Sequence, residues 1–162
     1  MLSSKAKYAL RAAVFLAARH QDSGWVLAAD IATAEVIPKK FLEAILVELR
    51  DSGIVDSRRG RHGGYRLALA PERVAAGDVI RTIDGPLALT PCTSRTRFGP
   101  CSDCVDPPLC ALRPVLQKAR DAIADVLDGS SLATLVEDGA GRTLKRKKRA
   151  PVVARPVVEE SG

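Results

Sequence analysis

The segment that follows Pro38 is the strongest constraint on the fold, because its apolar residues recur with the period of a helix. They all fall on one side of such a helix, and a stripe of this width needs a core to cover it. Pro38 lies where a helix can begin and Gly53 where it can end. We predict that the whole stripe is buried. It consists of Phe41, Leu42, Ile45, Leu46 and Leu49.

Two shorter helical segments precede this one. Residues 4–20 carry a broad apolar face after serines that can cap a helix, and residues 28–35 form a second short helix. Residues 25–27, between them, are a strand candidate. Residues 75–84 predict one more helix after the strongest one.

A basic hairpin is predicted between these helices. Residues 54–57 and 65–69 have strand-like patterns, and the sequence RRGRHGG joins them. Glycines permit a tight turn and a close approach of the backbone, and the arginines place charge where a hairpin projects farthest. Three helices followed by a hairpin with a basic tip are the order of a winged helix-turn-helix.

Charge is distributed unevenly over the 162 residues. Residues 1–66 carry 11 basic and seven acidic side chains, residues 67–137 carry seven and nine, and residues 138–162 carry seven and three. A basic N-terminal third predicts a polyanionic partner, most often nucleic acid. No apolar run reaches the roughly 18 residues needed to cross a bilayer, so we expect a cytoplasmic protein without a membrane segment.

Charged side chains on the strongest helix and on the hairpin are the candidate DNA contacts. A helix can lie in the major groove, where its side chains reach bases and phosphates, while a basic hairpin reaches the backbone or the minor groove. An ordinary solvated helix face is the alternative for the helix residues. The candidates are Lys39, Lys40 and Glu43 on the helix and Arg58, Arg59 and Arg61 on the hairpin.

All four cysteines fall within 19 residues, in a stretch rich in proline. Structural disulfides usually join distant parts of small secreted chains, so clustered thiols in a cytoplasmic protein indicate metal binding or redox chemistry. Thiolates bind both iron and zinc. The candidate metal ligands are Cys92, Cys101, Cys104 and Cys110.

Catalysis is not expected. A thiol redox enzyme that used Cys101 and Cys104 would need a nucleophilic cysteine at a helix N-terminus, but this pair lies in a proline-rich loop. The sequence contains neither a Ser/His/Asp set nor a phosphate-binding glycine loop.

Apolar residues repeat every three or four positions from Leu112 onward, as in a short heptad seam. A seam of this length cannot form an independent coiled coil, but it can pair two subunits. A capped turn is expected at 130–137, and the basic residues after it lack an apolar period, which predicts a disordered tail. The seam consists of Leu112, Leu116, Ala119, Ile123 and Val126.

Several motifs together resemble the Rrf family of bacterial winged-helix transcriptional regulators. They are IPKKFLEAI (37–45), LRDSGIV (49–55), SRRG (57–60), GGY (63–65), DVIRTIDG (78–85) and SLATL (131–135). The resemblance spans residues 1–137. It implies a homodimer that crosses through its long helix and binds DNA, with a cysteine loop that holds an iron-sulfur cluster. By this resemblance Glu43 reads bases and Arg59 enters the minor groove.

The cysteine pattern departs from that of the family. The family has three cysteines, the last two separated by five residues, and Cys104 and Cys110 reproduce this spacing. Cys92 is the natural first ligand, although it lies farther from Cys104 than the resemblance suggests. Cys101 is additional, so the three ligands are not decided by spacing.

The fourth ligand is also open. Where family members offer a histidine after the last cysteine or an aspartate near the N-terminus, this chain has Arg113 and Lys7, which do not readily bind iron. A water molecule or a small thiol could complete the site. The protein's own candidates are Cys101, Asp103 and Asp106.

These observations predict a mostly α fold with a small β-hairpin, a winged helix-turn-helix plus a long dimerisation helix. We expect a homodimeric regulator that binds a pseudo-palindromic operator in double-stranded DNA and senses iron, nitric oxide or redox state through a 2Fe-2S or 4Fe-4S cluster. The alternatives are a regulator with structural zinc or no metal and, less favoured, a thiol redox enzyme. The predicted parts are a DNA-binding domain (1–86), a cysteine-rich sensor loop (87–111), a dimerisation helix with a terminal turn (112–137) and a disordered basic tail (138–162).

Overall fold

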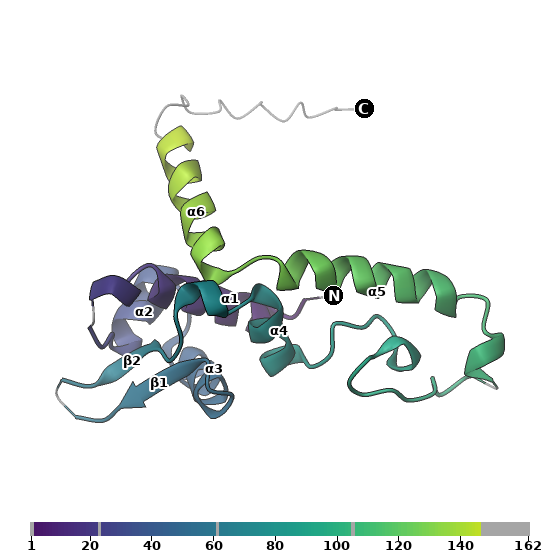
Figure 1. The fold of residues 1–162 in the computed structure, drawn as a ribbon. Coiled ribbons are helices and arrows are strands. Elements are labelled where there is room, and N and C mark those ends of the chain that lie inside the picture. Colours follow the sequence, from purple (N-terminus) through teal and green to yellow (C-terminus); the bar gives the residue numbers. More distant parts are fainter. Residues whose placement is uncertain (1, 23, 61, 105, 147–162) are drawn as a thin grey trace, which may run out of the picture.

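The computed structural model describes residues 2–22, 24–60, 62–104 and 106–146 (Figure 1). It is mostly helical with a single two-stranded antiparallel hairpin, as predicted. The main elements are α1 (Ser4–Ala17), α2 (Ala28–Glu35), α3 (Lys39–Asp51), β1 (Val55–Arg58), β2 (Gly64–Leu67), α4 (Ala76–Asp84), α5 (Arg113–Asp128) and α6 (Leu132–Arg146). Four single 3-10 turns join them: η1 (His20–Asp22), η2 (Pro71–Arg73), η3 (Pro91–Thr93) and η4 (Pro107–Leu109).

Residues 4–84, which we call the N-terminal body, share one apolar core. The Ser3 hydroxyl accepts a hydrogen bond from the Ala6 N–H at 3.0 Å and so caps α1. Helix α1 ends at Ala17, three residues before the predicted end, and η1 follows it. The small side chains of α1 let the other helices approach closely. Its buried residues are Ala6, Ala9, Ala12, Ala13, Leu16 and Ala17.

Helix α3 begins directly after Pro38, as predicted, and buries Leu42, Ile45, Leu46 and Leu49. The prediction for Phe41 is wrong, because this side chain is 39% exposed. Neighbouring residues on a helix point about 100° apart, so Phe41 lies at the edge of the stripe rather than at its centre. Its ring packs edge-on against Tyr8 of α1, with the ring centroids 5.8 Å apart.

The hairpin pairs Val55 with Leu67 and Arg58 with Gly64. The predicted strand at 25–27 is reduced to one bridge, in which Val26 and Tyr65 exchange backbone hydrogen bonds of 2.9 and 2.8 Å. Gly64 is required at this crossing. Its φ is +142°, and a Cβ there would lie 2.4 Å from the Val26 carbonyl oxygen.

Helix α5 extends from the N-terminal body alongside residues 87–111, which we call the cysteine segment (Figure 1). The Arg95 guanidinium, in this segment, forms an ion pair of 2.6 Å with Asp121 of α5. Most of the predicted heptad seam is in solvent, with Leu112 65%, Ile123 40% and Val126 68% exposed. Helix α5 therefore presents an apolar face that the described part of the chain leaves uncovered.

Helix α6 begins within the capped turn expected at 130–137, where the Thr134 N–H donates to the Ser131 hydroxyl at 3.1 Å. It continues to Arg146, into the part of the chain for which the sequence predicts a disordered tail. Leu132 is fully buried in the core and Leu135 and Val136 pack against it, which fixes the first turn. Adding residues to a helix that has already started costs little. The rest of the predicted tail, 147–162, lies outside the described residues. None of the described helices is long and apolar enough to span a membrane.

Candidate nucleic-acid interface and cysteine cavity

The N-terminal end of α3 carries the predicted helix contacts. Lys39, Lys40 and Glu43 are all exposed, whereas the opposite side of the helix is buried in the core. The Lys39 ammonium lies 3.8 Å from the Glu43 carboxylate, one helical turn away. Such an exposed ion pair stabilises the helix only weakly. Breaking it so that Lys39 and Glu43 contact DNA instead therefore costs little free energy.

The hairpin tip carries the predicted arginine contacts. Arg58 ends β1 and Arg59 follows it, and both are exposed. Neither has an ion-pair partner in the part of the chain that the structure describes. Arg61, the third predicted contact, lies outside the described residues. The structure thus leaves two unpaired guanidinium groups at the end of the hairpin.

All four cysteines line one cavity of about 470 Å³. It lies between the cysteine segment and the start of α5. The Cys92 side chain is buried, and the other three thiols are partly exposed. The remaining lining residues combine apolar side chains with two carboxylates: Thr90, Asp103, Asp106, Leu109, Leu112 and Leu116.

Short turns between prolines hold these cysteines. The Cys104 N–H donates to the Cys101 carbonyl at 3.1 Å, and the Cys110 N–H donates to the Pro107 carbonyl at 3.3 Å. The Cys101 thiol donates to the Cys92 sulfur at 3.8 Å, a distance that excludes a disulfide bond between them. The structure therefore places all four cysteines around one cavity, with the sulfurs of Cys92 and Cys101 in contact.

The thiols of Cys92 and Cys101 differ in acidity. The Thr90 hydroxyl, 3.4 Å from the Cys92 sulfur, lowers the pKa of Cys92, whereas burial raises it. The hydrogen bond from the Cys101 thiol and the positive charge of Arg113 also lower the pKa of Cys92. The hydrogen bond that Cys101 donates to Cys92 raises the pKa of Cys101. Of these two cysteines, Cys92 therefore forms the metal-binding thiolate more readily.

The arrangement of ligands differs from that of a single-ion site. Within the described residues, no group of three or more Cys, His, Asp or Glu side chains is placed to hold one metal ion. Cluster ligands are attached to different irons and need not converge on one point. Arg113, at the position where a histidine ligand was considered, donates to the Cys92 carbonyl at 3.4 Å and stacks over Phe98.

The sequence did not indicate four of the residues that line this cavity, Thr90, Leu109, Leu112 and Leu116. Thr90 contacts Cys92 because the turn at Pro91 folds the chain back, and the Thr-Pro-Cys order could have indicated this contact. Leu112 and Leu116 belong to the predicted dimer seam, yet both line the cysteine cavity.

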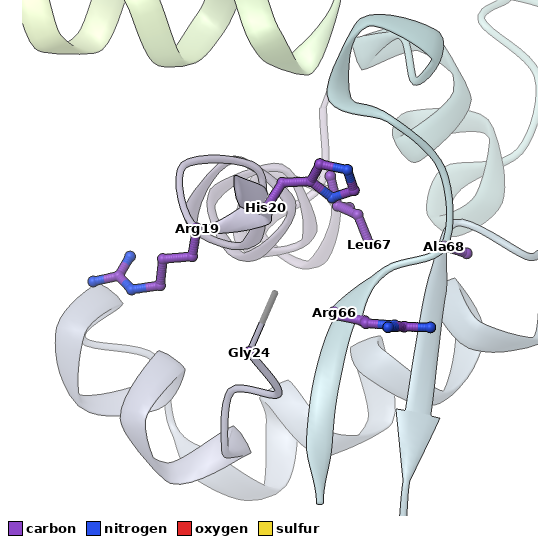
Figure 2. A pocket seen from close by; sticks show the side chains of 6 residues that line it. All are labelled: Arg19, His20, Gly24, Arg66, Leu67 and Ala68. Atoms are coloured by element: carbon purple, nitrogen blue, oxygen red, sulfur yellow. The ribbon is translucent and has the colours of Figure 1, made fainter. Parts of the chain in front are cut away.

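A second cavity, of about 310 Å³, lies between the end of α1 and β2 (Figure 2). Figure 2 shows the side chains of Arg19 and Arg66 extending in opposite directions. Arg19 stacks on Phe15 at 3.6 Å, and Arg66 lies over Trp25 at 4.5 Å and pairs with an aspartate of β1. Since neighbours within the fold already engage both arginines, this cavity is a weaker candidate for a site.

Comparison with known proteins assigns the family. Residues 2–138 match Rrf2, described as an iron-dependent transcriptional regulator. The chain belongs to the Rrf2 family of transcriptional regulators. It is 40% identical over 141 residues to an rrf2-like HTH-type transcriptional regulator of Rhodobacter capsulatus, covering 86% of this chain and 94% of that protein. It is 36% identical to the regulator NsrR of Geobacillus kaustophilus, covering 91% and 98% of the two chains.

Solved structures of Rrf2 regulators have the same fold. CymR, the global cysteine regulator of B. subtilis, superposes with a TM-score of 0.69 at 31% identity, covering 85% of this chain and 96% of that one. IscR of T. potens superposes with a TM-score of 0.68 at 27% identity, covering 94% and 93%. The winged-helix prediction and the family resemblance are confirmed. The protein is a DNA-binding transcriptional regulator and not a thiol redox enzyme.

Proposed function

We propose that this Rrf2 regulator is a homodimer whose affinity for a pseudo-palindromic operator depends on an iron-sulfur cluster in the cysteine cavity. The observation that carries the proposal is that all four thiols line one cavity of about 470 Å³. Apolar side chains form part of the wall and restrict water there, which favours a thiolate-bound cluster. The signal is iron, nitric oxide or redox state, each of which acts on such a cluster.

Cys92, Cys104 and Cys110 are the proposed ligands, with Cys101 as the fourth. Cys101 is favoured because its sulfur lies 3.8 Å from that of Cys92 and faces the same cavity. Four thiolates suit either a 2Fe-2S or a 4Fe-4S cluster. A bound cluster would supply redox chemistry and a reversible link between the cysteine segment and α5.

A second copy of the chain is proposed to cover α5. Three apolar side chains of its seam remain between 40% and 68% exposed, and an uncovered apolar row along a helix favours pairing with an equivalent helix. A two-fold dimer would present two α3 helices and two hairpins to successive turns of DNA. In this arrangement Lys39, Lys40 and Glu43 enter the major groove, and Arg58, Arg59 and Arg61 reach the backbone or the minor groove.

Structural zinc is the second candidate. Four thiolates also suit zinc, but one zinc ion requires ligands that converge tetrahedrally, and the described residues offer no such group. A regulator without a cluster is the other alternative. CymR, a cysteine regulator, is among the proteins with a similar fold.

The test is anaerobic purification followed by absorption spectroscopy and by analysis of iron, sulfide and zinc. We expect iron and sulfide in wild type and loss of most of both in each of the four Cys→Ala variants. Ser102→Ala is the matched control, since this exposed residue lies between two of the ligands. Operator affinity is then measured on fragments that the anaerobic protein selects from random DNA. The cluster proposal is contradicted if wild type contains zinc alone, or if every cysteine variant retains its iron.

A further inference from the structure

Two of the four cysteines touch each other. The sulfurs of Cys92 and Cys101 lie 3.8 Å apart, although nine positions separate the two residues in the sequence. The side chains of Cys104 and Cys110 make no hydrogen bond within the part of the chain that the structure describes. The cysteine cavity therefore contains one pair of thiols already in contact and two thiols without such a contact.

The backbone around Cys92 holds this contact in place. Cys92 is the middle residue of η3, where the Ser94 N–H donates to the Pro91 carbonyl at 3.1 Å. The Gly99 N–H donates to the same carbonyl at 3.3 Å, and this bond returns the chain to the turn two residues before Cys101. Hydrogen bonds thus close the loop between the two cysteines before any covalent bond forms. A disulfide between them would therefore cost little further chain entropy.

Polar groups surround the Cys92 sulfur. The Thr90 hydroxyl lies 3.4 Å from this sulfur and 3.3 Å from the Thr93 hydroxyl. The Arg113 Nε donates to the Cys92 carbonyl at 3.4 Å, which places a positive charge beside the cysteine. Cys92 is only 3% exposed but lines the cavity, so a small molecule reaches its sulfur through the cavity. A hydroxyl donor and a cation in these positions stabilise negative charge that develops on an oxygen next to the sulfur.

We propose that Cys92 and Cys101 form a reversible disulfide when a hydroperoxide enters the cysteine cavity. The Cys92 sulfur attacks one peroxide oxygen, so that an S–O bond forms and the O–O bond breaks. The second oxygen takes the thiol proton and leaves as water or an alcohol, and Cys92 becomes a sulfenic acid.

The second step joins the two sulfurs. The Cys101 sulfur attacks the Cys92 sulfur, so that the S–S bond forms and the S–O bond breaks. The hydroxyl group leaves as water with the proton of the Cys101 thiol. Two thiols are oxidised and one hydroperoxide is reduced, and no other reactant is needed.

The thiol chemistry needs no cluster, but its regulatory effect rests on the proposed function. Cys92 and Cys101 are both proposed ligands, and a sulfur in a disulfide no longer offers a thiolate to iron. A hydroperoxide would thus convert the regulator to a form that cannot rebind a cluster. A thiol reductant would restore the ligands by exchange with the disulfide.

The test is oxidation of the full chain, reduced and freed of metal by a chelator, with an equimolar amount of hydrogen peroxide. Remaining thiols are alkylated and counted by mass spectrometry. We expect wild type to lose two of its four free thiols and to recover both with dithiothreitol. Cys92→Ser and Cys101→Ser should each abolish the disulfide. Cys104→Ser and Cys110→Ser are the matched controls and should form it at the wild-type rate.

The role of the Thr90 hydroxyl is tested by Thr90→Val, which keeps the shape of the side chain. This variant should form the disulfide about tenfold more slowly, because one hydrogen bond to the reacting atoms is lost. Thr96→Val removes an exposed hydroxyl from the same segment and should react as wild type does. Circular dichroism shows whether each variant is folded. Equal rates for wild type and Thr90→Val would contradict the role of Thr90.

The proposal is overturned if peroxide leaves all four thiols of wild type free, or if it yields sulfinic acid without a disulfide. It is also overturned if Cys92 joins a cysteine other than Cys101, or if the disulfide links two copies of the chain on a non-reducing gel. Iron and sulfide analysis before chelation tests the cluster separately. Iron without a disulfide overturns the oxidation site alone, whereas a disulfide in a chain that binds no iron supports the thiol pair and contradicts the cluster.

Discussion

The N-terminal body buries most of its large apolar side chains, whereas the cysteine segment and α5 leave most of theirs in water. In the body, Leu42, Ile45 and Leu46 are fully buried. In the second region, Phe98 is 60%, Leu109 82% and Val126 68% exposed. The body is thus held by its own core, while the second region is held by ion pairs, prolines and short turns. Such a region has few buried apolar contacts to hold it, which is consistent with the sensing role proposed for the cysteine cavity.

The largest effect is expected from opening the core of the body. Leu46→Ala should lower the free energy of unfolding by about 2–5 kcal/mol, through lost burial and the cavity that remains. Val47→Ala is the control, because Val47 is the next residue on α3 but is 38% exposed. Its effect should stay within about 0.5 kcal/mol. Urea denaturation measures both, and equal losses would contradict the separation between buried and exposed faces of α3.

The exposed face of α5 is tested by a charge. Ile123→Asp should weaken dimerisation about a hundredfold or more, because an unpaired carboxylate at an apolar helix interface loses its water. Lys118→Asp places the same group on an exposed polar position of α5 and should leave the dimer intact. Sedimentation velocity over a range of concentrations distinguishes the two. A variant with Asp at position 123 that sediments as wild type does would move the subunit interface away from α5.

The hairpin tip is tested by removing one arginine. Arg59→Ala should weaken specific operator binding by about 1–3 kcal/mol if the guanidinium lies in a groove. Arg73→Ala, an exposed arginine in η2, should change binding little. Titrations at matched salt are required, because every lost charge lowers affinity at low ionic strength. The same affinity for wild type and Arg59→Ala would remove Arg59 from the DNA-reading surface.

Sequence reasoning succeeded where local pattern and core agree. The spacing of Ile45, Leu46 and Leu49 predicts the buried face of α3, and glycines with arginines predict the hairpin. It failed where packing between distant segments determines whether a side chain is buried. Phe41 meets Tyr8 at the edge of the stripe, a contact that periodicity does not contain.

The cavities show the same limit. Cysteine spacing predicts that the thiols gather, but the contact between Thr90 and Cys92 depends on a turn that the spacing does not contain. The length of α6 depends on Leu132, whose burial in the core starts a helix that the glycines after it do not favour. A single sequence shows which residues are capable of chemistry more readily than it shows their surroundings.

The smallest effect concerns a turn of the N-terminal body in which a residue other than glycine adopts a left-handed backbone conformation. Among the described residues other than glycine, only Val36, between α2 and α3, has a positive φ. Its φ is 50° and its ψ is 53°, a left-handed conformation that costs an L-residue about 1–2 kcal/mol. The side chain is 81% exposed, so its removal loses no burial.

Val36→Gly should therefore raise the free energy of unfolding by about 0.5–1 kcal/mol, since glycine adopts this conformation freely but loses more entropy on folding than valine does. Ala34→Gly, at an exposed position within α2, should lower it by about 1 kcal/mol, because its backbone is helical and gains nothing from glycine. Urea denaturation measures both free energies of unfolding, and the opposite signs of the two changes are easier to distinguish than their magnitudes. If both variants destabilise the fold, the left-handed turn is held by contacts rather than strained. If only Val36→Gly stabilises it, the body carries a strained residue three positions before the helix proposed to enter DNA, and the valine there lowers the stability of the fold.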